Sequence, residues 1–154
     1  MKYYHKYYVG IPFALTVTME SNSSIQRNNI LVIDPDKEFC KDVRLFLEEN
    51  YNVFTRQGME YIDYSILLNK INLIILEADN ADYNLVHLID KLRENHSNIK
   101  IIIMYTYFTA DKTTERALAR DADDMIAKPF DVCLLKNKVD RLLSGKLDFD
   151  SKKH

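Results

Sequence analysis

Glycine, proline and cysteine are scarce in this chain of 154 residues, which has three glycines, three prolines, two cysteines and no tryptophan. A glycine-rich loop that cradles a nucleotide phosphate is therefore not expected, and the segment after the first apolar run, residues 34–39, has no glycine at all. Cys40 and Cys133 lie far apart and match no metal-ligand spacing, so we expect two reduced thiols buried in helices. The four histidines do not cluster, which argues against an imidazole metal site.

An excess of either charge is also missing, because 21 basic and 23 acidic residues give a net charge of −2. Direct nucleic-acid binding usually needs a basic surplus, so we do not expect it here. No apolar run approaches the roughly 20 residues of a membrane span. The apolar stretch from Val9 to Met19 is interrupted by Pro12 and differs from a signal peptide. These observations predict a cytoplasmic protein that does not contact a membrane.

The composition predicts one globular domain with additions at both ends. Hydrophobic residues make up 47% of the chain, which is enough for a sizeable core at this length. Residues 1–28 combine tyrosines, a β-prone apolar stretch and a polar linker, and we interpret them as an N-terminal extension or linker. The domain is expected over residues 29–145, and residues 146–154 form a polar tail.

Short apolar runs alternate with amphipathic stretches from Asn29 onward, in five β–α units. Central runs such as residues 73–76 are apolar throughout, whereas residues 51–55 alternate and suit an edge strand. The last helix is expected to end at Gly145. This alternation predicts an α/β fold of the flavodoxin-like type: a doubly wound, five-stranded parallel sheet in the order 2-1-3-4-5, with helices on both faces.

Four polar side chains follow apolar runs of this sheet: Asp34, Glu77, Thr106 and Lys128. The carboxyl ends of parallel strands share one edge, where ligands of such sheets bind, so we expect the four to converge. Each alone also has an ordinary explanation. Asp34 is compatible with a helix N-cap before a proline, Glu77 with a loop carboxylate, and Lys128 with a strand exit before a proline. Four at matching strand ends favour a site that holds an anion or a metal.

The segments ILVIDPD, NLIILEAD, IIIMYT and ADDMIAKPFD resemble the response-regulator receiver domain of two-component signalling, of the chemotaxis-regulator type, over Asn29 to Leu143. The resemblance implies a module that accepts a phosphoryl group from a histidine kinase at the end of the third strand, with Mg²⁺ held by acids after the first and third strands. The positions carried over are Glu77 as the phosphoacceptor equivalent, Asp34 and Asp36 as the acidic pocket, Thr106 and Lys128 as the groups that grip the phosphoryl, and Met125 at the aromatic switch position.

The departures from this family pattern fall on the chemistry. Pro35 stands where a second acid is usual and cannot ligate a metal. Glu77 replaces the acceptor aspartate and is longer by one methylene, about 1.5 Å, a displacement that costs heavily in an in-line attack. Asp34 and Glu77 are left as metal ligands, so we expect weak or absent Mg²⁺ binding and no other cofactor. Glu77 is interpreted as a permanent anion paired with Lys128.

The sequence therefore predicts a degenerate pseudo-receiver: a non-enzymatic, phosphorylation-independent module that binds a signalling protein or a histidine kinase. A working phosphoacceptor receiver, with Asp34, Asp36 or Asp79 as substitute ligand or acceptor, stays open as an alternative, and so does a small flavodoxin-like cofactor binder. By the same resemblance, a homodimer would form through the fourth helix, fifth strand and fifth helix, whose charged residues include both signs.

Overall fold

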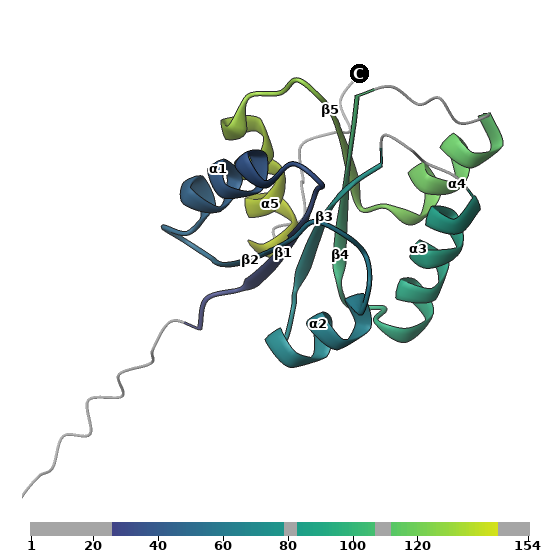
Figure 1. Cartoon of the computed structure of the whole chain (residues 1–154), viewed down its shortest axis with the longest axis horizontal. Helices are drawn as coiled ribbons and strands as arrows, with labels where there is room; N and C mark the ends of the chain where they lie inside the picture. The colour runs from purple at the N-terminus through teal and green to yellow at the C-terminus, as the bar shows by residue number, and fades with distance from the viewer. Residues whose placement is uncertain (1–25, 79–82, 107–111, 145–154) are drawn as a thin grey trace, which may run out of the picture.

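The computed structural model describes residues 26–78, 83–106 and 112–144, where strands and helices alternate along the chain (Figure 1). The strands are β1 (Asn29–Ile33), β2 (Asn52–Arg56), β3 (Leu73–Glu77), β4 (Lys100–Tyr105) and β5 (Asp124–Ala127). The helices are α1 (Lys37–Leu47), α2 (Ile62–Asn69), α3 (Tyr83–Asn95), α4 (Lys112–Asp121) and α5 (Val132–Ser144). Predictions for residues 1–25, Asp79, Gly145 and the tail lie outside the described residues.

The five strands form one parallel sheet in the order β2-β1-β3-β4-β5, which confirms the predicted doubly wound fold. The predicted edge strand is β2, and it pairs only with β1 in this sheet. The first four residues of β3 are fully buried because helices cover both faces of the sheet. This double covering is why the central runs are continuously apolar while the edge strand alternates.

Helices α1 and α5 cover one face of the sheet, and α2, α3 and α4 cover the other (Figure 1). Successive side chains of a strand point to opposite faces, so Leu31 packs in the core under α2–α4 and Val32 in the core under α1 and α5. Leu135 and Val139 bring α5 into the second core beside Val43 of α1. Each face of the sheet therefore has its own hydrophobic core.

Asp123, just before β5, ties three elements together. Its carboxylate accepts hydrogen bonds from Arg93 of α3 at 2.6 Å, from the Ile101 backbone N–H at 2.9 Å and from Lys100 at 3.1 Å. Burial alone would raise the pKa of Asp123, but these donors outweigh burial and hold the pKa below its ordinary value. Asp123 therefore stabilises the fold as a carboxylate.

The two cysteines differ in environment. Cys40 is buried under α1, as predicted, but Cys133 is exposed on α5, so the prediction that it is buried was wrong. The reason is helical geometry: α5 turns Leu135 and Val139 toward the sheet, and Cys133 lies on another side of the helix. Both thiols are free. No helix in the described part of the chain is both long and apolar enough to cross a membrane.

Candidate functional site

The carboxyl-terminal edge of the sheet carries the four polar residues singled out from the sequence. Asp34 follows β1, Glu77 is the last residue of β3, Thr106 follows β4 and Lys128 follows β5. The strands hold this edge in register, because the backbone N–H of Lys128 donates to the carbonyl oxygen of Tyr105 at 2.6 Å. The fold thus brings the four positions to one edge, while the roles assigned to them stay predictions.

Asp34 and Lys128 form an ion pair at the centre of this edge. The Lys128 Nζ lies 2.6 Å from Oδ2 of Asp34, and only 1% of Asp34 is exposed. The other oxygen, Oδ1, accepts the backbone N–H of Asp36 at 2.9 Å. Both oxygens of this buried carboxylate therefore have donors, and the pair joins residues that are 94 positions apart.

The N-cap of α1 is Asp36, so the alternative reading of Asp34 as a helix cap was wrong. The Asp36 carboxylate accepts the backbone N–H groups of Glu38 at 2.9 Å and Phe39 at 3.1 Å. Its carboxylate is thereby directed to the helix end, and the residue is exposed. Asp36 is therefore exposed at the start of α1, whereas Asp34 is buried, and the acidic pocket stays a prediction.

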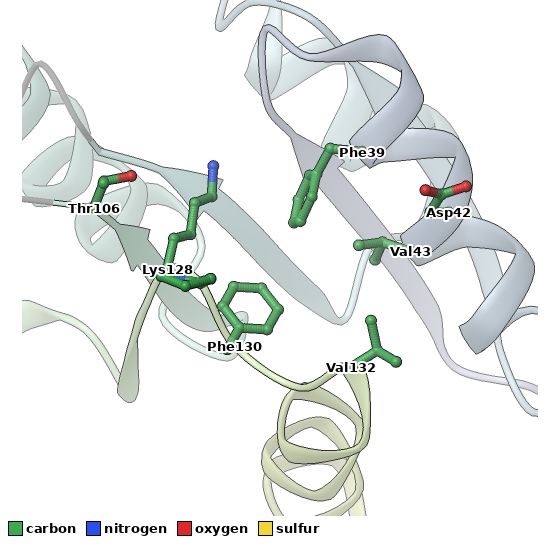
Figure 2. Close-up of a pocket in the computed structure, with 8 residues that line it drawn as sticks. Phe39, Asp42, Val43, Thr106, Lys128, Phe130 and Val132 are labelled. Carbon is green, nitrogen blue, oxygen red and sulfur yellow. The ribbon is translucent and has the colours of Figure 1, made fainter.

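An aromatic wall adjoins the ion pair and was not anticipated from the sequence. The Lys128 Nζ lies 4.7 Å from the ring centroid of Phe39, and the rings of Phe39 and Phe130 meet edge to face with centroids 6.0 Å apart. Figure 2 shows Lys128 passing between these rings and Thr106. A cation over a ring face is held electrostatically. Phe130 was visible in the KPF motif, but for Phe39 the only signal was its place on the apolar side of a helix.

A pocket of about 530 Å³ opens beside this wall (Figure 2). The side chains around it come from α1, from the end of β4 and from the segment that links β5 to α5. They are Phe39, Asp42, Val43, Thr106, Lys128, Pro129, Phe130 and Val132. The pocket is therefore mainly apolar, and its polar groups are the Lys128 ammonium, the Thr106 hydroxyl and the Asp42 carboxylate.

Cys40 lies beneath Asp34 and is not suited to nucleophilic chemistry. Its thiol lies 3.4 Å from the Asp34 backbone carbonyl oxygen, to which it donates. Burial, and next the negative charge of Asp34, raise the pKa of Cys40 above its ordinary value. The thiol therefore stays protonated and serves as a small buried side chain.

The side chains at this edge do not fit a Mg²⁺ ion, which needs several oxygen ligands in octahedral geometry. One oxygen of Asp34 is bound by Lys128, Pro35 has no side-chain donor atom, and the carboxylate of Asp36 caps α1. Among residues 26–78, 83–106 and 112–144, no group of three or more histidine, cysteine, aspartate or glutamate side chains is arranged to hold a metal. Weak or absent Mg²⁺ binding stays a prediction, and the contact that the structure shows at this edge is the charge pair of Asp34 and Lys128.

Met125, the residue at the predicted switch position, lies on β5 opposite Ile103 of β4. Its half-buried side chain packs against the core under α2–α4, whereas the next residue, Ile126, packs under α1 and α5. Met125 is therefore on the α4 side of the sheet. A flexible thioether there fills space without the hydroxyl or ring of an aromatic residue.

Comparison with known proteins identifies a family and several curated relatives. The response regulator receiver domain family matches residues 30–140. The chain is 30% identical over 115 residues to the regulatory protein VanRB of Enterococcus faecalis, which is 74% of this chain and 51% of the relative. It is 34% identical over 105 residues to the response regulator ArlR of Staphylococcus aureus, covering 67% and 47%. The chain thus spans about half the length of the curated relatives it matches.

Solved structures agree with this assignment. A two-component response regulator from Clostridium difficile superposes with a TM-score of 0.64 at 31% identity, over 77% of this chain and 98% of that one. A response regulator from Thermotoga maritima, at 22% identity and a TM-score of 0.67 over 77% of this chain and 98% of that one, supports the fold alone. Since the family matches well over half of the chain and the sheet has the order β2-β1-β3-β4-β5, this protein belongs to the response regulator receiver-domain family of two-component signalling.

Proposed function

We propose that this receiver domain acts as a phosphorylation-independent protein-interaction module, in which Glu77 supplies a permanent negative charge at the end of β3. The observation that carries the proposal is the Asp34–Lys128 contact of 2.6 Å with a proline at position 35. A carboxylate that is already bound by an ammonium group is a poor Mg²⁺ ligand, and proline offers no replacement. Phosphoryl transfer that depends on Mg²⁺ is then disfavoured.

Glu77 reinforces this proposal through its length and charge. Its carboxylate extends one methylene further than an aspartate would, so a reaction geometry set for aspartate is lost. At neutral pH its charge needs no phosphodonor. Pairing of Glu77 with Lys128 stays a prediction, since the ion pair that the structure gives Lys128 is with Asp34. In the proposed state, the positive charge of Lys128 balances the two acids Asp34 and Glu77. The fixed charge of Glu77 then biases the domain toward the form that phosphorylation would otherwise produce.

The partner that fits this proposal is a histidine kinase or another signalling protein, bound without a reaction catalysed by this domain and without direct contact to nucleic acid or membrane. Family membership favours a signalling module over the cofactor-binder alternative. The main rival is a working phosphoacceptor receiver, with Asp34, Asp36 or Asp79 as substitute ligand or acceptor. We also propose that the protein is cytoplasmic, because a receiver domain that binds a histidine kinase is expected in that compartment.

A homodimer through α4, β5 and α5 stays a prediction. Two of the charged residues expected to serve it, Lys138 and Arg141 of α5, are paired within the chain with Asp124 of β5, Lys138 at 2.7 Å. Burial raises the pKa of Asp124, but these donors outweigh it and keep the pKa low. A second copy on this face would have to compete with these internal pairs.

Mass spectrometry after incubation with acetyl phosphate and Mg²⁺ tests the proposal. We expect no gain of about 80 Da, the mass of one phosphoryl group, on the wild-type chain. The variant with both Pro35→Asp and Glu77→Asp should gain it and should bind Mg²⁺ more tightly. A stable adduct on the wild type would instead establish the phosphoacceptor alternative, and Asp36→Asn and Asp79→Asn would locate the adduct.

A second measurement addresses the fixed charge itself. Glu77→Gln should shift backbone amide resonances in β5 and α4, and not only those of residues next to position 77. The reason is that removing one acid changes the negative charge that balances the Lys128 ammonium. Glu49→Gln, at an exposed position after α1, removes the same charge elsewhere and serves as the control. Equal and local shifts in both variants would show that Glu77 has no special role.

A further inference from the structure

Helix α2 is apolar on its outer face as well as on its inner one. Its inner side buries Ile62 and Ile66 against the sheet, together with Ser65. Helices that are apolar all round are normally covered on all sides. In Figure 1, α2 lies at the bottom of the view, on the same side of the sheet as α3 and α4, at the margin of the molecule. Its outer face therefore calls for a covering surface.

The exposed fractions show how unusual this outer face is: Tyr61 is 80% exposed, Tyr64 64%, Leu67 68% and Leu68 63%. Within residues 26–78, 83–106 and 112–144, only Leu45 and Leu134 otherwise combine large apolar side chains with such exposure. Residues three or four positions apart share one side of a helix, so Tyr64 and Leu68 lie on one side of α2 with Leu67 beside them, and Tyr61 is the N-cap residue just before the helix. We call these four side chains the α2 patch.

We propose that the α2 patch is a self-association surface, on which a second copy of this chain packs its own α2 patch around a two-fold axis. At about 150–250 Å² for an aromatic side chain and somewhat less for leucine, the patch exposes roughly 500 Å² per copy. A two-fold pair would then bury on the order of 1,000 Å², the size at which a specific interface becomes credible. Residues at the margin of the patch add to this area.

The charges at the two ends of α2 make the patch complementary to itself. Glu60 precedes the helix and Lys70 follows it, and both residues are exposed. In an antiparallel pair centred between Tyr64 and Ser65, Tyr61 of one copy faces Leu68 of the other, and Glu60 approaches the other copy's Lys70. The helix dipoles are then antiparallel as well, which is the favourable arrangement. The patch itself carries no charge that would select a partner of the opposite sign.

The charged side chain on α2 nearest the patch is engaged elsewhere. Asp63 lies 2.9 Å from Nε2 of His96, at the end of α3, and so turns toward the neighbouring helix. None of the strand-end residues Asp34, Glu77, Thr106 and Lys128 belongs to α2. The proposed contact is therefore independent of the proposed function, and failure of either leaves the other standing.

Sedimentation velocity of the full chain over a wide concentration range tests the contact. The wild type should show a reversible monomer–dimer equilibrium, and Leu68→Asp should raise the dissociation constant at least tenfold. Leu45→Asp and Leu134→Asp place the same charge at exposed leucines on α1 and α5, and they should leave the equilibrium unchanged. Circular dichroism and thermal melts establish that each variant is folded.

Charge reversal gives a readout that simple loss of apolar contact would not. Glu60→Lys alone, or Lys70→Glu alone, should weaken the dimer, and the chain with both changes should regain it. These side chains are exposed, so the variants do not depend on repacking a core. A chain that stays monomeric at all concentrations would overturn the proposal. So would a dimer that Leu134→Asp or Arg141→Glu weakens and Leu68→Asp does not, because that dimer uses the α4–β5–α5 face.

Discussion

Replacing Lys128 by methionine should destabilise the domain more than any surface charge change, because it leaves the Asp34 carboxylate buried without its counter-ion. At 2.6 Å and an effective dielectric constant of about 20, the attraction within the pair is roughly 6 kcal/mol before desolvation. Desolvation cancels most of it, but removing one partner of a buried pair typically costs about 3–5 kcal/mol. We expect about 3 kcal/mol, because the methionine retains part of the packing against Phe39.

Replacing Asp34 should cost less stability than replacing Lys128, because the Lys128 side chain is 20% exposed and that of Asp34 only 2%. Asp34→Asn leaves an ammonium group that water and the Phe39 ring still stabilise, so we expect a loss of about 1–2 kcal/mol. In the double variant, with both Asp34→Asn and Lys128→Met, no buried charge is left without a partner. Its total loss should therefore fall short of the sum of the single losses by about 1–3 kcal/mol.

Urea unfolding monitored by circular dichroism measures these differences. With a slope of about 2 kcal/mol per molar urea, a loss of 3 kcal/mol lowers the midpoint by roughly 1.5 M. Lys41→Met is the matched control, because Lys41 pairs with Glu38 at 3.5 Å and both side chains are more than half exposed. It should change stability by under about 0.5 kcal/mol. The reasoning would be refuted if Lys128→Met matched this control or if the cycle were additive.

Three further outcomes follow from other parts of the molecule. The folded-state pKa of Asp123 is lowered, so its contribution to stability is fully present above the unfolded value of about 3.9 and is lost as pH falls through the folded value. Thermal melts at pH 5 and pH 3 should therefore show a smaller acid-induced drop in Asp123→Asn than in the wild type. Lys70 has a φ of 49°, so Lys70→Gly should raise the unfolding free energy by about 1 kcal/mol, and an unchanged urea midpoint would contradict this. Removing residues 1–25 should leave the melting temperature within a few degrees, because all five β–α units follow them, and a collapse would show that they pack on the domain.

The architecture was predictable because its causes are local. A strand covered on both faces has to be apolar at every position, so runs such as residues 73–76 identify central strands. The alternating run at residues 51–55 marked the edge, which the sheet order confirms as β2. Strand ends then fix which polar residues share an edge. The predicted topology is therefore enough to place Asp34 and Lys128 at the same edge of the sheet.

Contacts between distant segments were not predictable in the same way. Periodicity places a residue on a helix side but cannot say which neighbour fills that side, so Cys133 was misplaced and Phe39 was missed. Which of Asp34 and Asp36 caps α1 depends on where the chain turns after β1. The proline between them does not reveal the position of that turn. The outer face of α2 was hidden for the opposite reason, since a helix with large apolar residues on opposite sides gives no signal of which side is buried.

The division of the core into two faces also sets an order of events during synthesis. Val43 and Leu47 of α1 belong to the same core as Leu135 and Val139 of α5, and residues 48–131 are made in between. At roughly 5–20 residues per second, that interval lasts on the order of 5–15 s, during which the nascent chain carries half of an apolar face without its cover. The α2–α4 face closes earlier because its helices are consecutive. A ribosome-bound chain that has been made past Leu118 but not yet to Leu135 therefore has its cover on the α2–α4 face, while the other face stays open to chaperones or to neighbouring chains until α5 is added.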